Sequence, residues 1–202
     1  MPIETDKPLQ QAVSALAGPG WGVVDDFLPA TLWQALARRA AGHRFHAAGI
    51  GRRARQRTAI RGDAIHWLEA PHAPEETAFL ERVEALRLAI NRALWLGLLD
   101  FECHYARYPV GARYARHHDR PADRPERTVT LICYLNPDWR TGDGGALRIH
   151  LPDRAPVDVL PVGGRAVVFL SERFEHEVLP ARRPRLALTG WYRRRPHGGR
   201  AM

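Results

Sequence analysis

The sequence predicts an α+β fold that is mainly β, in which supporting helices near the N-terminus precede a sandwich or jelly roll. Two observations lead to this prediction. From about residue 101 onward, short runs of β-forming residues alternate with Gly, Pro and Asp, and the residues before them contain three helical patterns. Short strands at this spacing favour two packed sheets, because such a fold protects its exposed edges. The expected strands are residues 101–108, 114–119, 128–135, 146–151, 157–160, 166–170, 176–179 and 186–192.

The first hundred residues supply the expected helices. Residues 7–16, 30–41 and 75–96 each carry apolar side chains at helical spacing, and the longest of the three begins with acidic residues. Residues 21–28 are typical of a strand that ends before Pro29. Residues 45–61 contain five arginines and two glycines, which favours strand edges joined by an exposed basic loop. These segments are expected to support the β core and to cover its site.

Length and composition indicate one domain. The chain has 202 residues, of which 45% are hydrophobic, enough for a well-packed core. We expect residues 1–98 to form the support and a substrate lid, residues 99–195 the jelly-roll core, and residues 196–202 a flexible tail. The sequence has no run of about 18 uncharged apolar residues and no secretion signal, which predicts a cytoplasmic protein without a membrane partner. Only Cys103 and Cys133 are present, which fits buried thiols in a reducing compartment.

The positive charge raises the question of nucleic acid. The formal net charge is +8, but Lys7 is the only lysine and nearly all of the positive charge is arginine. No helix-turn-helix, zinc-finger or RNA-binding signature accompanies this charge, so a solvated surface is favoured over a nucleic-acid site. The densest basic runs, residues 52–57 and 193–195, are candidates for contact with an acidic partner.

One ordered set of residues carries the chemistry. In an extended strand His117 and Asp119 project from the same side, whereas His118 points the other way. With His176 farther along, they make two imidazoles and one carboxylate, the set that holds non-haem Fe(II) on one face and leaves other positions open. An isolated His-x-Asp arises readily in a chain with ten histidines, so the ordered set is the evidence. Arg185, nine residues after His176, opens a strand-like run and can form a bidentate fork to a carboxylate.

Five stretches match a known family in order. They are Arg61-Gly62-Asp63 to Glu69, Tyr108-Pro109 to Asp119, Val129 to Trp139, Gly144 to Ile149, and His176 to Tyr192. On these stretches the chain resembles the Fe(II)- and 2-oxoglutarate-dependent dioxygenases, and within them the prolyl hydroxylases related to the animal oxygen-sensing enzymes. The loop between Tyr108 and His117 is one residue shorter than in the animal enzymes, which concerns the rim of the pocket and not the iron site.

The resemblance implies a double-stranded β-helix, a jelly roll whose mouth holds iron. Arg185 would bind the distal carboxylate of 2-oxoglutarate with help from the Tyr134 hydroxyl, and Tyr108 would line the same pocket. The implied iron ligands are His117, Asp119 and His176.

The resemblance also implies a substrate side. Trp191 would line the pocket, and Trp67 would belong to a lid that a pair between Asp63 and Arg127 ties to the barrel. From the residues alone, Tyr134 and Trp191 are equally consistent with core aromatics. For Asp63 and Arg127, the pairing is favoured over two unrelated surface charges, because both positions match their family segments.

The implied activity is 4-hydroxylation of a proline residue in a protein, with Fe(II), 2-oxoglutarate and O2 as cofactor and cosubstrates and succinate and CO2 as products. The resemblance adds ascorbate to this set. The expected partner is a protein with an exposed proline, either acidic or part of the translation machinery. The alternatives are the same iron chemistry on a small molecule or another side chain, a nucleic-acid demethylase, and a basic binding module without turnover. The complete set with Arg185 argues against the last.

Overall fold

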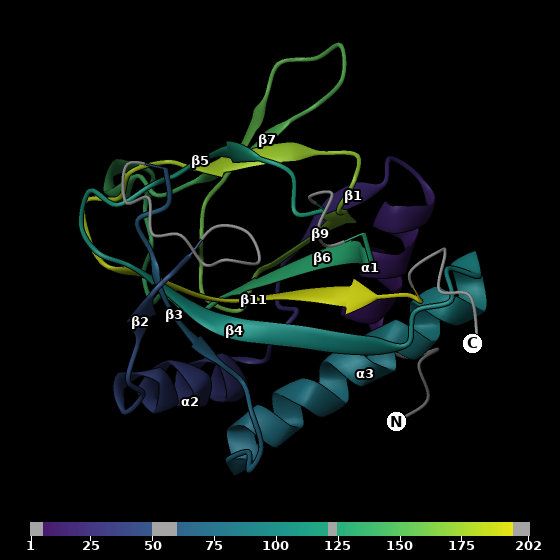
Figure 1. Ribbon diagram of the computed structural model, residues 1–202, viewed down its shortest axis with the longest axis horizontal. Helices are drawn as coiled ribbons and strands as arrows, with labels where there is room; N and C mark the ends of the chain where they lie inside the picture. The colour runs from purple at the N-terminus through teal and green to yellow at the C-terminus, as the bar shows by residue number, and fades with distance from the viewer. Residues whose placement is uncertain (1–5, 50–59, 121–124, 196–202) are drawn as a thin grey trace, which may run out of the picture.

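Two antiparallel sheets face each other, and helices cover the outer side of the larger one (Figure 1). The computed structural model describes residues 6–49, 60–120 and 125–195. The helical elements are α1 (Lys7–Ala17), α2 (Ala30–Ala41), α3 (Pro74–Leu94) and the short 3-10 turn η2 (Thr141–Asp143). The major sheet contains, in spatial order, β1 (Trp21–Val24), β9 (Ala166–Leu170), β6 (Arg127–Tyr134), β11 (Arg185–Arg193), β4 (Asp100–Tyr108), β3 (Ala64–Trp67) and β2 (His46–Ala47). The minor sheet contains β5 (Tyr114–His117), β10 (Glu175–Val178), β7 (Leu147–His150) and β8 (Val157–Val159).

Alternation along the central strands divides the interior into two cores. On β6, Leu131 and Cys133 point to the helices, while Ile132 and Tyr134 point to the minor sheet. The first core joins the outer face of the major sheet to α1, α2 and α3, and the second fills the space between the sheets. We call this second space the cup, because its inner walls carry the candidate site.

A buried carboxylate fastens α3 beneath the sheet. Glu76 accepts a hydrogen bond from the Ala73 backbone amide at 2.9 Å, which satisfies an amide at the start of the helix. Its other oxygen lies 2.9 Å from His43 Nε2 and 3.4 Å from the Tyr105 hydroxyl on β4. Burial alone would raise the pKa of Glu76. The hydrogen bonds from the Ala73 amide and His43 and the charge of Arg39 outweigh burial, so the pKa is lowered. The ionised carboxylate therefore links α2, α3 and the major sheet.

The sequence located most of these elements. The eight predicted strands correspond to β4 through β11, with ends that differ by at most two residues. The strand expected over residues 21–28 ends at Val24, because the chain turns at Asp25–Asp26 and Asp26 has a left-handed φ of 53°. β2 lies within residues 45–61, where strand edges were expected, whereas β3 was not predicted, and with β1 they extend the major sheet at both ends. Both cysteines are buried and free, as expected.

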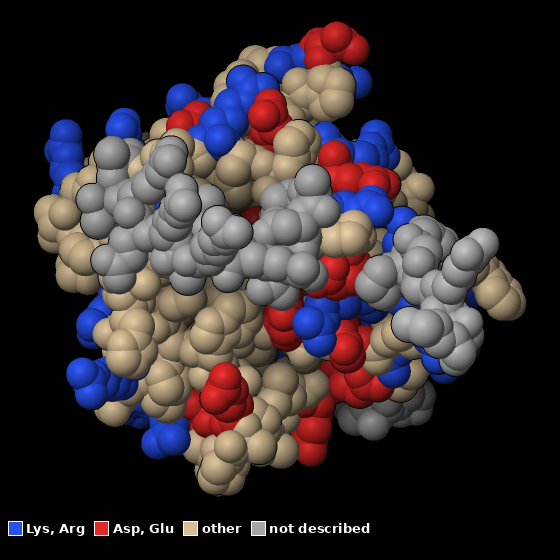
Figure 2. All heavy atoms as spheres, viewed as in Figure 1, with Lys and Arg blue, Asp and Glu red and all other residues tan. Residues whose placement is uncertain are grey.

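Ion pairs balance much of the surface charge. On the face shown in Figure 2, Lys and Arg side chains are interspersed with Asp and Glu. Pairs of this kind bridge neighbouring strands, as in Arg148 with Asp158 at 2.7 Å and Arg193 with Asp100 at 2.8 Å. The basic run at residues 52–57 and the tail at residues 196–202 lie outside the described residues. Among the described helices, none has the length and apolar character that crossing a membrane requires.

Candidate active site

Three side chains converge where β5 and β10 meet. His117 ends β5 and is the direct partner of His176 on β10 in the antiparallel pairing. Asp119 follows two residues after His117, beyond the end of the strand. Its carboxylate oxygens lie 3.4 Å from His117 Nε2 and 3.5 Å from His176 Nε2, and one ligand atom from each residue lies within 4.8 Å of the other two. This triad can hold one metal ion through two imidazoles and a carboxylate.

Hydrogen bonds determine which imidazole nitrogen faces the centre of the triad. His117 Nδ1 lies 2.8 Å from the Ala115 carbonyl oxygen, and His176 Nδ1 lies 3.3 Å from that of Phe174. Each Nδ1 therefore donates its proton to a carbonyl, which leaves the Nε2 lone pairs free for a metal. Burial lowers the pKa of His176 to about 4, although the charge of Asp119 opposes this shift. The ring is thus neutral at physiological pH, the form that binds a metal.

The carboxylate of the triad is held from behind by two hydroxyls. Thr130 Oγ1 on β6 donates to Asp119 Oδ2 at 3.0 Å, and it lies 2.9 Å from Ser171 Oγ. A hydroxyl has one proton, so Ser171 donates to Thr130 and the relay points toward the carboxylate. Burial would raise the pKa of Asp119, but the electrostatic interactions with His176 and His117 hold it well below its usual range. Asp119 is therefore ionised and fixed in orientation.

A buried cation lies deeper in the cup. Arg185, the first residue of β11, is 2% exposed, and its Nε donates to the Gly145 carbonyl oxygen at 3.0 Å. Its guanidinium carbon lies 5.0 Å from the Tyr108 ring centroid and 5.1 Å from that of Tyr134. Among the described residues no carboxylate pairs with Arg185, and the buried Tyr134 hydroxyl has no hydrogen-bond partner. A buried charge without a counter-ion and a buried hydroxyl without a hydrogen-bond partner are costly, so this end of the cup suits an anionic ligand such as a carboxylate.

An aromatic wall leads from the triad toward the edge of the major sheet. Trp191 on β11 is opposite Thr130 in the strand pairing and is 4% exposed. The neighbouring strands add His104, whose ring lies 5.5 Å from that of Trp191, and Trp67, whose ring lies 4.9 Å from that of His104. Burial lowers the pKa of His104 to about 4, so this ring is neutral. Trp67 is 38% exposed, which places the outer part of this wall in contact with solvent.

Comparison with known proteins places this site in a family. The family model described as the 2OG-Fe(II) oxygenase superfamily matches residues 103–193. Over the fold, the chain is similar to a prolyl-4-hydroxylase of Pseudomonas putida, with 47% sequence identity, a TM-score of 0.84, and coverage of 93% of this chain and 100% of that one. The chain belongs to the 2OG-Fe(II) oxygenase superfamily.

Two further proteins are similar to this oxygenase over most of its chain. A Trichoplax adhaerens prolyl hydroxylase, solved with a hypoxia inducible factor peptide fragment, has 29% identity and a TM-score of 0.82, with 96% of this chain and 93% of that chain covered. Human Egl nine homolog 1 is 32% identical over 199 residues, which covers 91% of this chain and 46% of the relative. The oxygenase spans less than half the length of that curated relative. The expected jelly roll, the fold of these oxygenases, is confirmed.

Fe(II), 2-oxoglutarate and O2 are the cofactor and cosubstrates of this superfamily, and the oxygenase carries a His-Asp-His triad that fits the metal. The triad, the Arg185 group and the aromatic wall all face the cup. His118 is exposed, consistent with its assignment to the opposite side of the strand. His150, on the outer face of the minor sheet, lies 3.0 Å from Glu177, which is a surface role.

The predicted pair between Asp63 and Arg127 is wrong in this structure, because each residue has a nearer partner. The buried Asp63 carboxylate accepts hydrogen bonds from Arg61 at 2.7 and 3.0 Å. Arg127 Nε instead donates to Glu102 on β4 at 2.9 Å. The Arg127 guanidinium carbon also lies 3.5 Å from the Trp191 ring centroid, so Arg127 packs against the aromatic wall.

Sequence analysis missed the residues that connect the Arg-Gly-Asp segment to the metal triad. Arg61 forms an isolated bridge with Tyr114, and its guanidinium carbon lies 4.8 Å from the Tyr114 ring centroid. The Tyr114 ring in turn stacks on His117, with centroids 3.6 Å apart. A signal was available, because Arg61 and Asp63 have the spacing that places two side chains on one side of an extended segment. For Thr130 the signal was a hydroxyl between the apolar residues Val129 and Leu131.

Proposed function

We propose that this oxygenase is a protein prolyl 4-hydroxylase that uses Fe(II), 2-oxoglutarate and O2 and releases succinate and CO2. The observation that carries the proposal is a buried Arg185 that pairs with no carboxylate in the described part of the chain, on the same strand and the same face as Trp191, beside a triad suited to iron. The named similarity to prolyl hydroxylases over nearly the whole chain supports proline as the target.

The two ends of the cup would bind different groups. His117, Asp119 and His176 would hold iron, which when bound supplies the oxidation of a C–H bond to a hydroxyl at the expense of 2-oxoglutarate and O2. Arg185 would bind the distal carboxylate of 2-oxoglutarate, because its guanidinium has no other anion among the described residues. The Tyr134 hydroxyl would donate to the same carboxylate, and Tyr108 would close the side of this pocket.

The aromatic wall would position the proline. Trp191 offers a flat, buried face for a pyrrolidine ring, and Arg127 stacked on it restricts its rotation. Trp67 extends the wall outward to where a polypeptide chain can pass, which supports a residue within a protein over free proline. Asp63, through Arg61 and Tyr114, would couple the segment that precedes β3 to the metal site.

The substrate protein is proposed to be acidic or to belong to the translation machinery. The net charge of +8 supports an acidic partner, because opposite potentials speed encounter. The free buried cysteines support a cytoplasmic location, and the superfamily chemistry supports ascorbate as an accessory reductant.

Mass spectrometry of host-cell proteins tests this proposal. An extract is incubated with the protein, Fe(II) and 2-oxoglutarate, and tryptic peptides are searched for one added oxygen on proline. We expect the parent protein to produce such peptides and His176→Ala to produce none. Succinate release without any modified proline would contradict prolyl hydroxylation, and stimulation of that release by a small molecule would then favour a metabolite substrate.

A further inference from the structure

A short segment after α3 exposes two large apolar side chains. We call residues 95–99 the knuckle. Trp95 is 88% exposed and Leu99 is 54% exposed. Trp95 also has a left-handed φ of 53°, a conformation that is a genuine outlier for a bulky residue. A strained backbone that holds an exposed tryptophan is typical of functional positions.

The knuckle is braced by the protein beneath it. The Asn91 side chain accepts a hydrogen bond from the Leu98 amide and donates one to the Leu98 carbonyl oxygen, both at 2.8 Å. Leu98 is buried in the helix-side core, and the Leu99 amide donates to the Arg193 carbonyl oxygen at 2.7 Å. The exposed side chains therefore project from an ordered backbone, so their binding would cost little conformational entropy.

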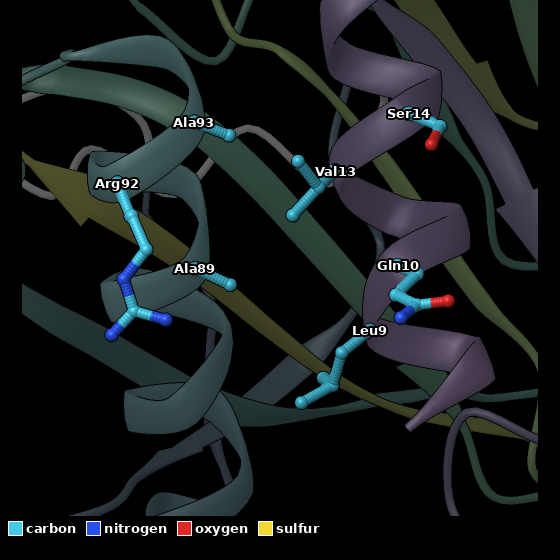
Figure 3. Close-up of a pocket in the computed structure, with 7 residues that line it drawn as sticks. All are labelled: Leu9, Gln10, Val13, Ser14, Ala89, Arg92 and Ala93. Carbon is cyan, nitrogen blue, oxygen red and sulfur yellow. The ribbon is translucent and has the colours of Figure 1, made fainter. Parts of the chain in front are cut away.

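An apolar groove adjoins the knuckle. It lies between α1 and α3 and has a volume of about 380 Å³, and Figure 3 shows Leu9 and Val13 pointing toward Ala89 and Ala93. Arg92 also lines this groove and lies three residues before Trp95, so it stands between the groove and the knuckle. Among the described residues, Arg92 has no carboxylate partner. The surface thus combines an apolar groove, an aromatic projection and an unpaired cation.

The knuckle lies at the substrate end of the major sheet. Leu99 immediately precedes β4, whose first residue pairs with Arg193 at the end of β11. Two residues farther along β4, Glu102 is opposite Trp191 of the aromatic wall. A rise of about 3.3 Å per residue places Leu99 on the order of 10 Å along the strand from that wall. Arg185 lies at the other end of β11, so one bound protein could contact the knuckle and the aromatic wall together.

We propose that the knuckle, the groove and Arg92 form a docking surface for a folded substrate protein, in addition to the pocket that receives its proline. This inference rests on the proposed prolyl hydroxylation. The partner would receive Trp95 in an apolar pocket, place an apolar side chain in the groove and offer a carboxylate to Arg92. A second copy of the chain fits less well, because a symmetric contact would oppose Arg92 to itself between two chains of charge +8.

The test compares intact proteins with peptides as substrates. The enzyme is given host-cell extract either intact or digested with trypsin, and hydroxyproline is counted in each. Trp95→Gly is the main variant, because glycine accepts a left-handed φ and the helix end keeps its conformation. Arg92→Glu is the second variant. Val23→Ala is the matched control, because Val23 is 39% exposed and lies on β1, at the edge of the major sheet opposite the one that carries β3 and β2.

We expect Trp95→Gly and Arg92→Glu to lower hydroxylation of intact proteins about tenfold or more, as loss of a binding hot spot does, and to change that of peptides less than about twofold. Val23→Ala should match the parent on both substrates. If the parent modifies both substrates and Trp95→Gly lowers neither, or lowers both equally, docking is refuted while prolyl hydroxylation stands. If the parent modifies neither substrate, the proposed function fails and docking fails with it. A parent dimer that Trp95→Gly converts to monomer would assign this surface to a second copy and overturn the proposal.

Discussion

Thr130→Val tests how the oxygenase holds its metal. Valine has nearly the shape of threonine, and Thr130 is fully buried in β6, so the substitution removes the hydroxyl with little change in packing. In the parent, Thr130 donates to Asp119 Oδ2 at 3.0 Å and receives the proton of Ser171. The variant leaves one oxygen of Asp119 without its donor and the carboxylate free to rotate.

The size of the effect follows from that single hydrogen bond. A hydrogen bond to a charged group contributes roughly 1.5–3 kcal/mol. Each ~1.4 kcal/mol changes an equilibrium constant about tenfold. We therefore expect Thr130→Val to weaken metal binding by about 10- to 100-fold, the range found when partners of metal ligands are removed.

Calorimetric titration with Mn(II) under anaerobic conditions measures this effect without oxidation of the metal. Ser171→Ala is the control, because it keeps the donor to Asp119 and should weaken binding by less than about threefold. A melting curve verifies that both variants are folded. Parental Mn(II) affinity in a folded Thr130→Val protein would refute the view that this hydroxyl orients the carboxylate.

Four further outcomes are expected. Alanine at any residue of the triad should abolish metal binding, whereas His118→Ala should retain it, as metal analysis of the purified variants would show. Arg185→Ala should keep its metal but need roughly 10- to 100-fold more 2-oxoglutarate, since it loses a charged hydrogen bond; an unchanged titration would place the carboxylate site elsewhere. Burial raises the pKa of Cys103 and Cys133 well above the usual thiol range, so iodoacetamide should label neither until denaturant is added, and rapid labelling of the folded protein would contradict their burial. Folding lowers the pKa of Glu76, so the stabilisation that its ionised carboxylate gives the fold is complete above the ordinary carboxyl pKa and is lost as the pH falls through the folded-state pKa. Glu76→Gln should therefore lower the melting temperature at neutral pH, and by less in acid.

The local sequence pattern predicted the strands and helices but not the order of the strands in each sheet. Alternation within a strand such as β6 depends only on neighbouring residues, so the limits of the strands could be found from the sequence. Which strands pair depends on contacts between distant segments, and the joining of β1 to β9 across more than a hundred residues has no local signature. β3 was missed as a strand because the segment before it is dominated by arginine and glycine.

The same distinction applies to the site. The triad and Arg185 were identifiable because their spacing along the chain reflects the geometry of three strands. The pairing of Asp63 with Arg127 was predicted from resemblance, and it failed because Glu102 lies nearer to Arg127. Glu102 is far from Arg127 in sequence, and strand pairing alone brings the two together. Which of several carboxylates pairs with one arginine depends on differences of a few ångströms in distance, and no sequence pattern predicts such differences.

β11 also constrains how this enzyme can change over evolutionary time. Arg185 and Trp191 are six residues apart on one strand, an even number, so both face the cup at a separation of about 20 Å. Insertion or deletion of one residue between them would turn one of the two toward the helices while the other stayed in place. Changes of length in this lineage should therefore accumulate in the connections between strands. New substrates would then be acquired by changes at the rim of the pocket, while the distance between the 2-oxoglutarate site at Arg185 and the proline site at Trp191 stays constant.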